Sequence, residues 1–309
     1  MSSYKTALDI VQSTEDSVPM LVDDLLPQKG LAAIAGESDS GKSTWLRQLG
    51  LSVSIGEETF LGRTLNSVHN RVLYVSTEDA IENIGPGLKV QVEILSDLED
   101  DALSNYYFLD DLSEFQNTIS ELSEDQRFDL IIIDCFSDFI KKDMNSATEV
   151  RNTLSYLNRI SNKLDCLILV LHHVRKSAID NQSASKSDIL GSTGFEGKMR
   201  AVLMLINGMN EYQKRLRIVK ANYLDPAVKQ RDLVLKFQNR VFELIGDSQV
   251  QNIDPVAERN DKAIEIIESF LPRIEQGEMI KDLFDEAKKQ GYPFGKSKFY
   301  EQIKEMNDN

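Results

Sequence analysis

The sequence predicts an α/β fold with a mostly parallel central sheet, and three observations support this prediction. Residues 36–43 read G-x-x-x-x-G-K-S, the pattern of a phosphate-binding loop. The loop stands between an apolar run at 31–35, which predicts a buried strand, and a stretch at 43–53 that predicts a helix. Two more apolar runs, 129–134 and 166–171, lead into acidic or histidine side chains, as strands do when they deliver polar groups to one sheet edge.

Composition sets the scale of the molecule and limits its partners. The chain has 309 residues, 41% of them hydrophobic, which suits one large α/β domain with a small appendage. A net charge of −15 argues against a broadly basic surface that coats nucleic acid, so any DNA contact must be local. The chain shows neither a secretory signal nor an apolar run of membrane-spanning length, and we therefore expect a cytosolic protein without a membrane partner.

The loop predicts a nucleotide site. Backbone N–H groups of such a loop cradle phosphates, Lys42 reaches the β- and γ-phosphates, and the Ser43 hydroxyl is a Mg²⁺ ligand. An ordinary Gly/Ser turn is the alternative interpretation, which the strand-to-helix context disfavours. The charges of Glu37 and Asp39 must point away from a polyphosphate. The predicted cofactor-binding residues are Gly36, Glu37, Ser38, Asp39, Ser40, Gly41, Lys42, Ser43 and Thr44.

Before and after the loop, the elements are expected in the following order. Residues 1–19 predict a loosely packed arm, and residues 56–70 a connection. The run 71–77 predicts a strand that carries Glu78 and Asp79 to its carboxyl edge. An irregular helix interrupted at 85–87, a short strand and a second helix follow at 80–96, 106–109 and 112–122.

Two further strands carry candidate site residues. The run 129–134 ends in Asp134, whose carboxylate is expected to support Mg²⁺ opposite the loop, although it could instead cap the strand. A helix is expected at 148–164. The run 166–171 delivers His172 and His173 to the same edge, where a structural role and a phosphate-sensing role are about equally favoured. Cys135 and Cys166 adjoin apolar runs, which favours buried thiols over a disulfide or metal ligands.

The last third of the chain predicts antiparallel strands and then helices. Short β-like runs at 200–206, 215–221, 232–237 and 240–245 are expected to extend the sheet with antiparallel strands. A polar linker at 247–257 then precedes a small helical domain at 258–309, with helices at 261–271, 278–290 and 296–306. The last two helices suit a helix-turn-helix, and a helical lid or oligomerisation appendage is the alternative.

Taken together, these motifs resemble the RecA-like ATPases and, among them, the plasmid RepA-type hexameric replicative helicases. The resemblance covers residues 20 to about 245 and predicts a RecA-like ATPase domain at 20–246. It is carried by the loop and by four motifs that follow in order: Glu78-Asp79, Asp134, His172-His173 and residues 220–223.

The resemblance also implies roles for single residues. It implies that Glu78 is the general base, that Asp134 supports Mg²⁺ together with Ser43, and that His173 senses the γ-phosphate of ATP. It further implies that Lys220 enters the neighbouring subunit's site and that Arg200 falls near the arginine finger. One departure stands out, because related helicases often carry Lys-x-Arg where this chain has Asn222 at the third position.

The function implied is a ring-forming, hexameric, ATP-driven motor on single-stranded DNA, a helicase serving replication or transfer of a mobile element. Its nucleic-acid contacts would come from cations on two loops at 137–146 and 174–192: Lys141, Lys142, Arg175, Lys176 and Lys186. The alternative is a nucleotide-switched regulator or scaffold whose C-terminal domain binds a protein or duplex DNA and which unwinds nothing.

Overall fold

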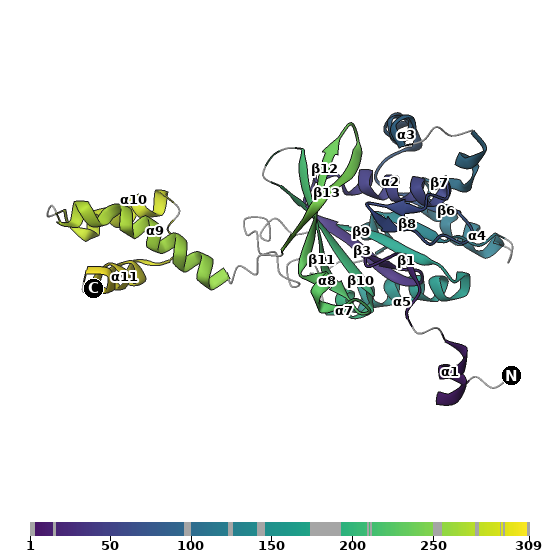
Figure 1. Cartoon of the computed structure of the whole chain (residues 1–309), viewed down its shortest axis with the longest axis horizontal. Coiled ribbons are helices and arrows are strands. Elements are labelled where there is room, and N and C mark those ends of the chain that lie inside the picture. Colours follow the sequence, from purple (N-terminus) through teal and green to yellow (C-terminus); the bar gives the residue numbers. More distant parts are fainter. Residues whose placement is uncertain are drawn as a thin grey trace. The chain divides into compact units, whose positions relative to one another are not determined.

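The computed structural model describes residues 4–14, 17–95, 100–122, 126–140, 146–173, 193–208, 210, 212–249, 255–275, 278–290, 292 and 294–307. The chain divides into two compact units (Figure 1). The larger unit contains the sheet and its helices, and the smaller unit contains the helices after residue 250.

A nine-stranded sheet in the order β13-β12-β11-β10-β3-β9-β8-β6-β7 forms the larger unit. Six neighbouring strands are parallel and the last three along the chain are antiparallel, so the prediction of a mostly parallel sheet with antiparallel C-terminal strands is confirmed. The parallel strands are β3 (Gly30–Gly36), β6 (Val72–Ser76), β7 (Tyr106–Leu109), β8 (Leu130–Asp134), β9 (Leu167–His173) and β10 (Ala201–Asn207). The antiparallel strands are β11 (Gln213–Ala221), β12 (Arg231–Gln238) and β13 (Val241–Gln249).

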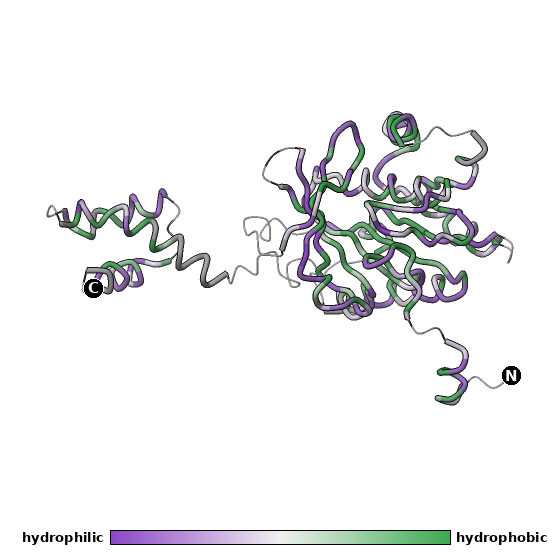
Figure 2. The backbone as a smooth tube through the Cα atoms, viewed as in Figure 1, coloured by the Kyte–Doolittle hydropathy of each residue, from purple (hydrophilic) through white to green (hydrophobic). Residues whose placement is uncertain are grey.

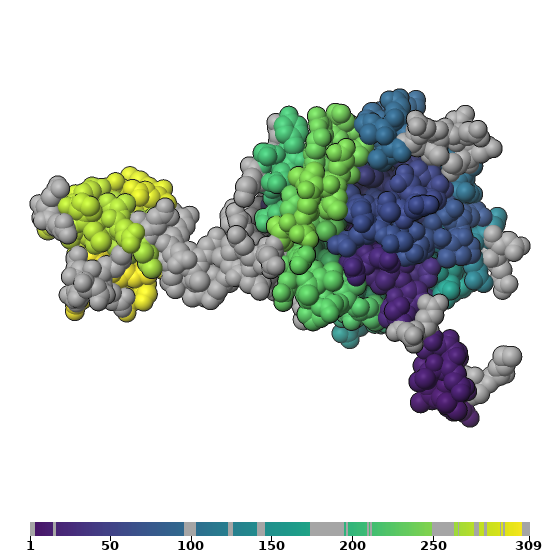
Figure 3. Space-filling view, in the orientation of Figure 1, coloured from purple at the N-terminus to yellow at the C-terminus, as the bar shows by residue number. Residues whose placement is uncertain are grey.

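β10 is the strand whose direction was predicted wrongly. It was expected with the antiparallel strands, but it pairs with β3 in parallel, Leu205 opposite Gly36. The chain enters β10 from the short helix α7 (Thr193–Lys198), so it crosses over from β9 to the far side of β3 instead of turning back in a hairpin. The surfaces of residues 200–249 and of the first third of the chain consequently lie side by side (Figure 3).

Helices cover the sheet, and each strand face has its own core. The helices are α2 (Lys42–Ser54), α3 (Ile81–Leu95), α4 (Leu112–Glu121) and α5 (Ala147–Leu164). On one face, Trp45 packs in a buried cluster with Ile34 and Ile132, and on the other Leu154 packs with Ile133. Burial on both faces explains why the central strands are continuously hydrophobic instead of alternating (Figure 2).

The sequence predicted an interruption in α3 that the structure does not contain. α3 runs unbroken through residues 85–87, with Pro86 as its sixth residue. Gly87 is buried, and an ideal Cβ on it would lie 3.1 Å from the Arg240 guanidinium, so the glycine allows the turn between β12 and β13 to approach the helix. The Gly-Pro-Gly sequence therefore marks close packing here and not a helix end.

Several short elements were not predicted, because ladders of two or three residues leave no periodicity in a sequence. They are α1 (Ala7–Ser13), β1 (Met20–Val22), β2 (Leu26–Pro27), β4 (Thr59–Phe60), β5 (Arg63–Thr64), α8 (Pro226–Lys229) and two 3-10 helices, η1 (Asp100–Asn105) and η2 (Phe136–Phe139). Thr6 and Asp9 form a capping box at the start of α1, and residues 4–14 are all exposed.

The smaller unit contains three helices with a core of their own. These are α9 (Pro255–Glu275), α10 (Ile280–Lys289) and α11 (Lys296–Asn307). Side chains from all three helices meet in this core, among them Ile267, Phe270, Leu283, Phe299 and Ile303. β13 extends to Gln249 and α9 begins at Pro255, so the connection is shorter than the predicted linker at 247–257. Within the described residues, no helix is long and apolar enough to span a membrane.

Separate cores predict separate folding. We expect a chain of residues 1–254 to stay folded and to bind ATP, because the buried cluster of the smaller unit is built from its own helices. Circular dichroism and nucleotide-binding measurements on the purified shortened chain would check this. Aggregation of that chain would mean that the helices complete the larger unit or a subunit interface.

Candidate nucleotide site at the carboxyl edge of the sheet

Two glycines fix the shape of the predicted phosphate loop. Gly36 ends β3 with φ +153°, and Gly41 precedes α2 with φ +95°. An ideal Cβ on Gly36 would lie 2.4 Å from the Leu205 carbonyl oxygen, and one on Gly41 would lie 2.9 Å from Cζ of Phe242. Side chains are excluded at both positions. The loop can therefore bring backbone N–H groups and the amino end of α2 to an anion.

Lys42 is buried in the loop, and its ammonium donates to the carbonyl oxygen of Glu37. Burial lowers the pKa of Lys42, while the charges of Asp134 and then Glu78 oppose that shift. The lysine is thus held among acidic groups that favour its charged form. A bound phosphate could replace the carbonyl as its partner.

The side chain of Glu37 points away from the loop centre, as the sequence requires. Asn207, at the end of β10, donates from Nδ2 to Glu37 Oε2 at 3.0 Å. The nearly buried Lys214 in turn donates from Nζ to Asn207 Oδ1 at 2.6 Å, and burial lowers the pKa of this lysine. The carboxylate is therefore anchored by β10 and β11 and does not face the phosphates.

Asp134 lies at the end of β8 and is almost fully buried. Its Oδ2 accepts a hydrogen bond from the Tyr74 hydroxyl, whereas Oδ1 has no hydrogen-bond partner among the described residues. Burial raises the pKa of the carboxyl, and the Tyr74 and Ser43 hydroxyls lower it. A buried carboxylate oxygen without a partner, close to a serine hydroxyl, suits a hard cation such as Mg²⁺.

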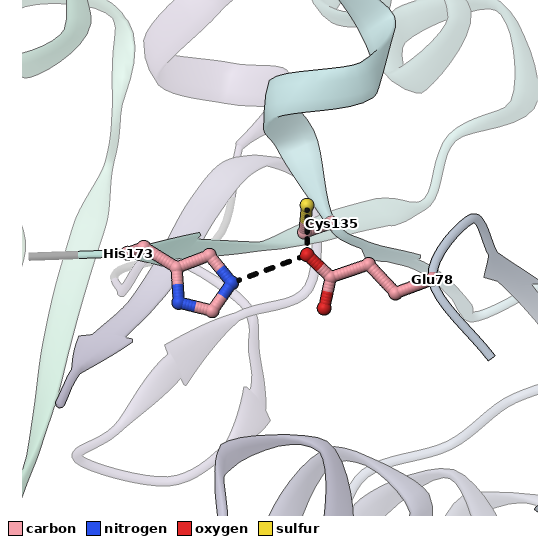
Figure 4. Close-up of side chains that lie close together, drawn as sticks. All are labelled: Glu78, Cys135 and His173. Carbon is pink, nitrogen blue, oxygen red and sulfur yellow. Dashed lines mark hydrogen bonds and ion pairs between the residues drawn. The ribbon is translucent and has the colours of Figure 1, made fainter. Parts of the chain in front are cut away.

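Glu78, Cys135 and His173 meet beside the loop (Figure 4). They follow or end β6, β8 and β9, which are adjacent in the sheet. Glu78 Oε1 lies 3.4 Å from His173 Nε2 and accepts from the Cys135 thiol at 3.1 Å. The Glu78 and His173 side chains are 53% and 42% exposed, so both can reach a ligand from solvent.

The turn that carries Glu78 is tied to the turn after β8. The Thr77 backbone N–H donates to the Asp134 carbonyl oxygen at 2.7 Å, and the Cys135 N–H donates to Thr77 Oγ1 at 3.0 Å. Thr77 also donates from its hydroxyl to the Asp138 carboxylate. Glu78 is therefore positioned by backbone contacts on either side of the expected metal ligand Asp134.

The two histidines point in different directions, as neighbouring strand residues must. His173 faces Glu78, while His172 stacks on Phe195 with ring centroids 4.6 Å apart. The pair is thus split between the two interpretations that the sequence left open. His172 packs against the core of the unit, and His173 belongs to the candidate site.

Arg200 and Lys220 lie together at the opposite edge of the sheet, not at the loop. The Arg200 N–H donates to the carbonyl oxygen of Leu31 near the start of β3, and Asn222 donates to the Arg200 carbonyl oxygen at 3.1 Å. Lys220 stands opposite Val202 near the start of β10. Arg200 is exposed and lines a cleft of about 560 Å³ at this edge.

The five candidate nucleic-acid contacts, Lys141, Lys142, Arg175, Lys176 and Lys186, lie outside the described residues. Three polar residues of the site were missed by sequence reasoning, namely Tyr74, Asn207 and Lys214. Tyr74 offered a signal, since a tyrosine inside an apolar strand needs a hydrogen-bond partner for its hydroxyl. Asn207 and Lys214 offered none, because the direction of β10 decides that they lie beside the loop.

Comparison with known proteins agrees with this geometry. The AAA domain family matches residues 4–178, which is more than half of the chain. The solved structure of a helicase ATPase domain is similar, with a TM-score of 0.54, 14% identity and coverage of 77% of this chain and 96% of that chain. The RadB recombinase has a TM-score of 0.50, 17% identity and coverage of 70% and 91%. No curated protein sequence matches the chain significantly. The chain therefore belongs to the AAA domain family and has the fold of the RecA-like P-loop ATPases.

Proposed function

We propose that this protein is a cytosolic, ring-forming ATPase that moves along single-stranded DNA, a helicase of the plasmid RepA type. The observation that carries the proposal is the separation of Arg200 and Lys220 from the phosphate loop of their own subunit. Both cations are of the kind that stabilises charge during phosphoryl transfer. In a ring, the edge that carries them would face the loop of the neighbouring subunit.

The strand register argues against a role for these cations in their own site. Lys220 is level with Ala33 of β3 through Val202, three residues before Gly36, or about 10 Å along the strand. It also lies two strands away from β3, roughly 10 Å across the sheet. Arg200 is further still, since it bonds to Leu31. Neither side chain is long enough to cover this separation, so a role in hydrolysis requires a second subunit.

The residues at the loop edge suit ATP and Mg²⁺. The backbone of residues 36–41, shaped by the two glycines, would bind the phosphates, and Lys42 would neutralise the β- and γ-phosphates. Ser43 and the unpartnered oxygen of Asp134 would hold Mg²⁺, which supplies charge neutralisation at the transferred phosphoryl group. We assign the orientation of the attacking water to Glu78, whose exposed carboxylate lies beside this site.

His173 links this chemistry to movement. Its Nε2 lies 3.4 Å from Glu78, and residue 174 begins one of the two segments predicted to bind DNA. A change in the contacts of Glu78 during hydrolysis would therefore reach the segment 174–192 through a single side chain. Five cations per subunit, repeated around a ring, would give a local basic channel despite the net charge of −15.

Two observations favour a second candidate function, a nucleotide-switched regulator of the same fold. The third position after Lys220 is Asn222, whereas the related helicases often have arginine there, and the chain as a whole is acidic. In this alternative the helices α9 to α11, as a helix-turn-helix or as a protein-binding appendage, would recognise the partner.

ATP hydrolysis measured with and without single-stranded DNA, together with mass measurement with and without ATP, tests the two functions. A motor should assemble into a ring with nucleotide, and its turnover should rise several-fold when single-stranded DNA is added. A monomer whose turnover ignores single-stranded DNA would favour the regulator. Duplex DNA of the same length is the matched control.

A further inference from the structure

We infer that Glu78, Cys135 and His173 form a binding site for a divalent cation of the zinc class, and that this ion inhibits the protein by capturing the catalytic base. The inhibition rests on the proposed function, because it assumes that Glu78 is the base. The binding of the ion does not, since it follows from the three side chains alone.

The geometry of the three ligand atoms suits a small tetrahedral ion. The carboxylate oxygen, the sulfur and a ring nitrogen all lie within 4.8 Å of one another. Oε1 of Glu78 lies 3.1 Å from the sulfur and 3.4 Å from Nε2 of His173. Bonds of about 2.0–2.3 Å in a tetrahedral zinc site put ligand atoms about 3.3–3.7 Å apart. Only small side-chain rotations are therefore needed to centre an ion among the three.

The donor set selects the kind of ion. Thiolate and imidazole ligands favour Zn²⁺ and similar borderline ions, whereas Mg²⁺ prefers oxygen ligands and suits the separate Ser43 and Asp134 pair. Glu78 and His173 are both substantially exposed. This leaves a side of the site open to solvent, where a water could complete the coordination, as in zinc sites with three protein ligands.

Binding replaces a proton on the sulfur by the metal ion. Burial raises the pKa of the Cys135 thiol to about 12, and the neighbouring Glu78 and Asp138 carboxylates raise it as well. Without an ion the sulfur therefore keeps its proton and donates it to Glu78 Oε1. On binding, the thiol proton leaves to solvent and a metal–sulfur bond forms, with no oxidation or reduction. The Ser137 hydroxyl, hydrogen-bonded to the same sulfur, can donate to the resulting thiolate.

Coordination would remove two functions at once. The Glu78 oxygen that faces Cys135 and His173 would be bound to the ion and could no longer orient water. The His173 ring would be fixed at the same time and could not respond to the nucleotide. A zinc-class ion would thus compete with hydrolysis while Mg²⁺ supports it.

Cobalt titration of the full-length protein tests binding without reference to ATP. Co²⁺ is a spectroscopic substitute for Zn²⁺, and a cobalt–thiolate bond gives a near-ultraviolet absorption band. We expect this band to saturate at one equivalent of Co²⁺ and to vanish in Cys135→Ser. The matched control is Cys166→Ser, since Cys166 is the other buried free cysteine and precedes β9 at the opposite edge. It should keep the band.

A second variant keeps the test valid if Cys135→Ser is unstable. His173→Gln changes an exposed side chain and should weaken Co²⁺ binding at least ~10-fold, because lost support of a metal typically costs about 10- to 100-fold in affinity. Absence of the band in the wild-type protein would overturn the proposed site. The same holds if Cys166→Ser alone removes the band, or if His173→Gln leaves affinity unchanged.

Zn²⁺ added to ATP hydrolysis assays with excess Mg²⁺ separates the two proposals. Zn²⁺ should inhibit the wild-type protein and Cys166→Ser at concentrations that leave Cys135→Ser at its own uninhibited rate. If Co²⁺ binds as expected but Zn²⁺ does not inhibit, the site stands and the role of Glu78 as base is wrong. If the protein hydrolyses no ATP at all, the proposed function fails and the cobalt titration still decides the metal site.

Discussion

Glu78→Gln should bind ATP as the wild-type protein does and hydrolyse it at least ~100-fold more slowly, because a positioned general base contributes roughly 10²- to 10⁴-fold. Glutamine has the shape of glutamate and keeps an oxygen that can accept from the Cys135 thiol, so the local structure should survive. What it loses is the charge that draws a proton from the attacking water.

Steady-state turnover and nucleotide affinity, measured on the same preparations, check this prediction. Lys42→Ala is the matched control, because its buried ammonium is aimed into the loop and its loss should weaken nucleotide binding itself. The two variants thus separate a defect in chemistry from a defect in binding. Near wild-type turnover of Glu78→Gln would remove Glu78 from the role, with Asp79 as the next residue to test.

Much of the larger unit could be predicted because its signals are local. The loop spacing, the flanking run 31–35 and the apolar run ending at Asp134 each lie within a few residues of one another, and a parallel strand buried on both faces is recognisable from composition alone. The predicted convergence of Glu78, Asp134 and His173 at one edge needed only one further rule, that parallel strands end at the same side of the sheet.

What could not be predicted depends on contacts between distant segments. The parallel direction of β10 follows from a crossover whose path leaves no local pattern, and it brings Asn207 and Lys214 to the loop. Cys135 was expected to be a buried thiol, and it is buried. Its sulfur is nevertheless within reach of two exposed ligands, because the turn after β6 folds over the end of β8.

The position of Arg200 and Lys220 is the clearest example. From the sequence, each could have been assigned to its own subunit's site. The register of β3, β10 and β11 instead puts both near the amino end of β3, while Gly36 stands at its carboxyl end. The residues could be named from the sequence, but the argument that they need a neighbour comes only from the strand pairing.

Mixing Glu78→Gln subunits with Lys220→Ala subunits should restore ATP hydrolysis that neither variant has alone. Lys220→Ala should itself be severely impaired, since a cation inserted from a neighbour can be worth roughly 10³ to 10⁵ in rate when it is an arginine. In a head-to-tail ring, each site combines Glu78 of one subunit with Lys220 of the next. Random mixing in equal amounts makes about one site in four intact, so activity should recover to about a quarter of wild type.

Two controls decide what a recovery means. Mixing Glu78→Gln with Lys42→Ala puts both defects on the loop edge of the sheet, so every mixed site keeps one defect and no activity should return. Specific activity of the wild-type protein should also rise with its concentration, because assembly completes the sites. If co-assembled Glu78→Gln and Lys220→Ala subunits stay inactive, or if a proven monomer is fully active, the cations do not act between subunits and the ring must be abandoned.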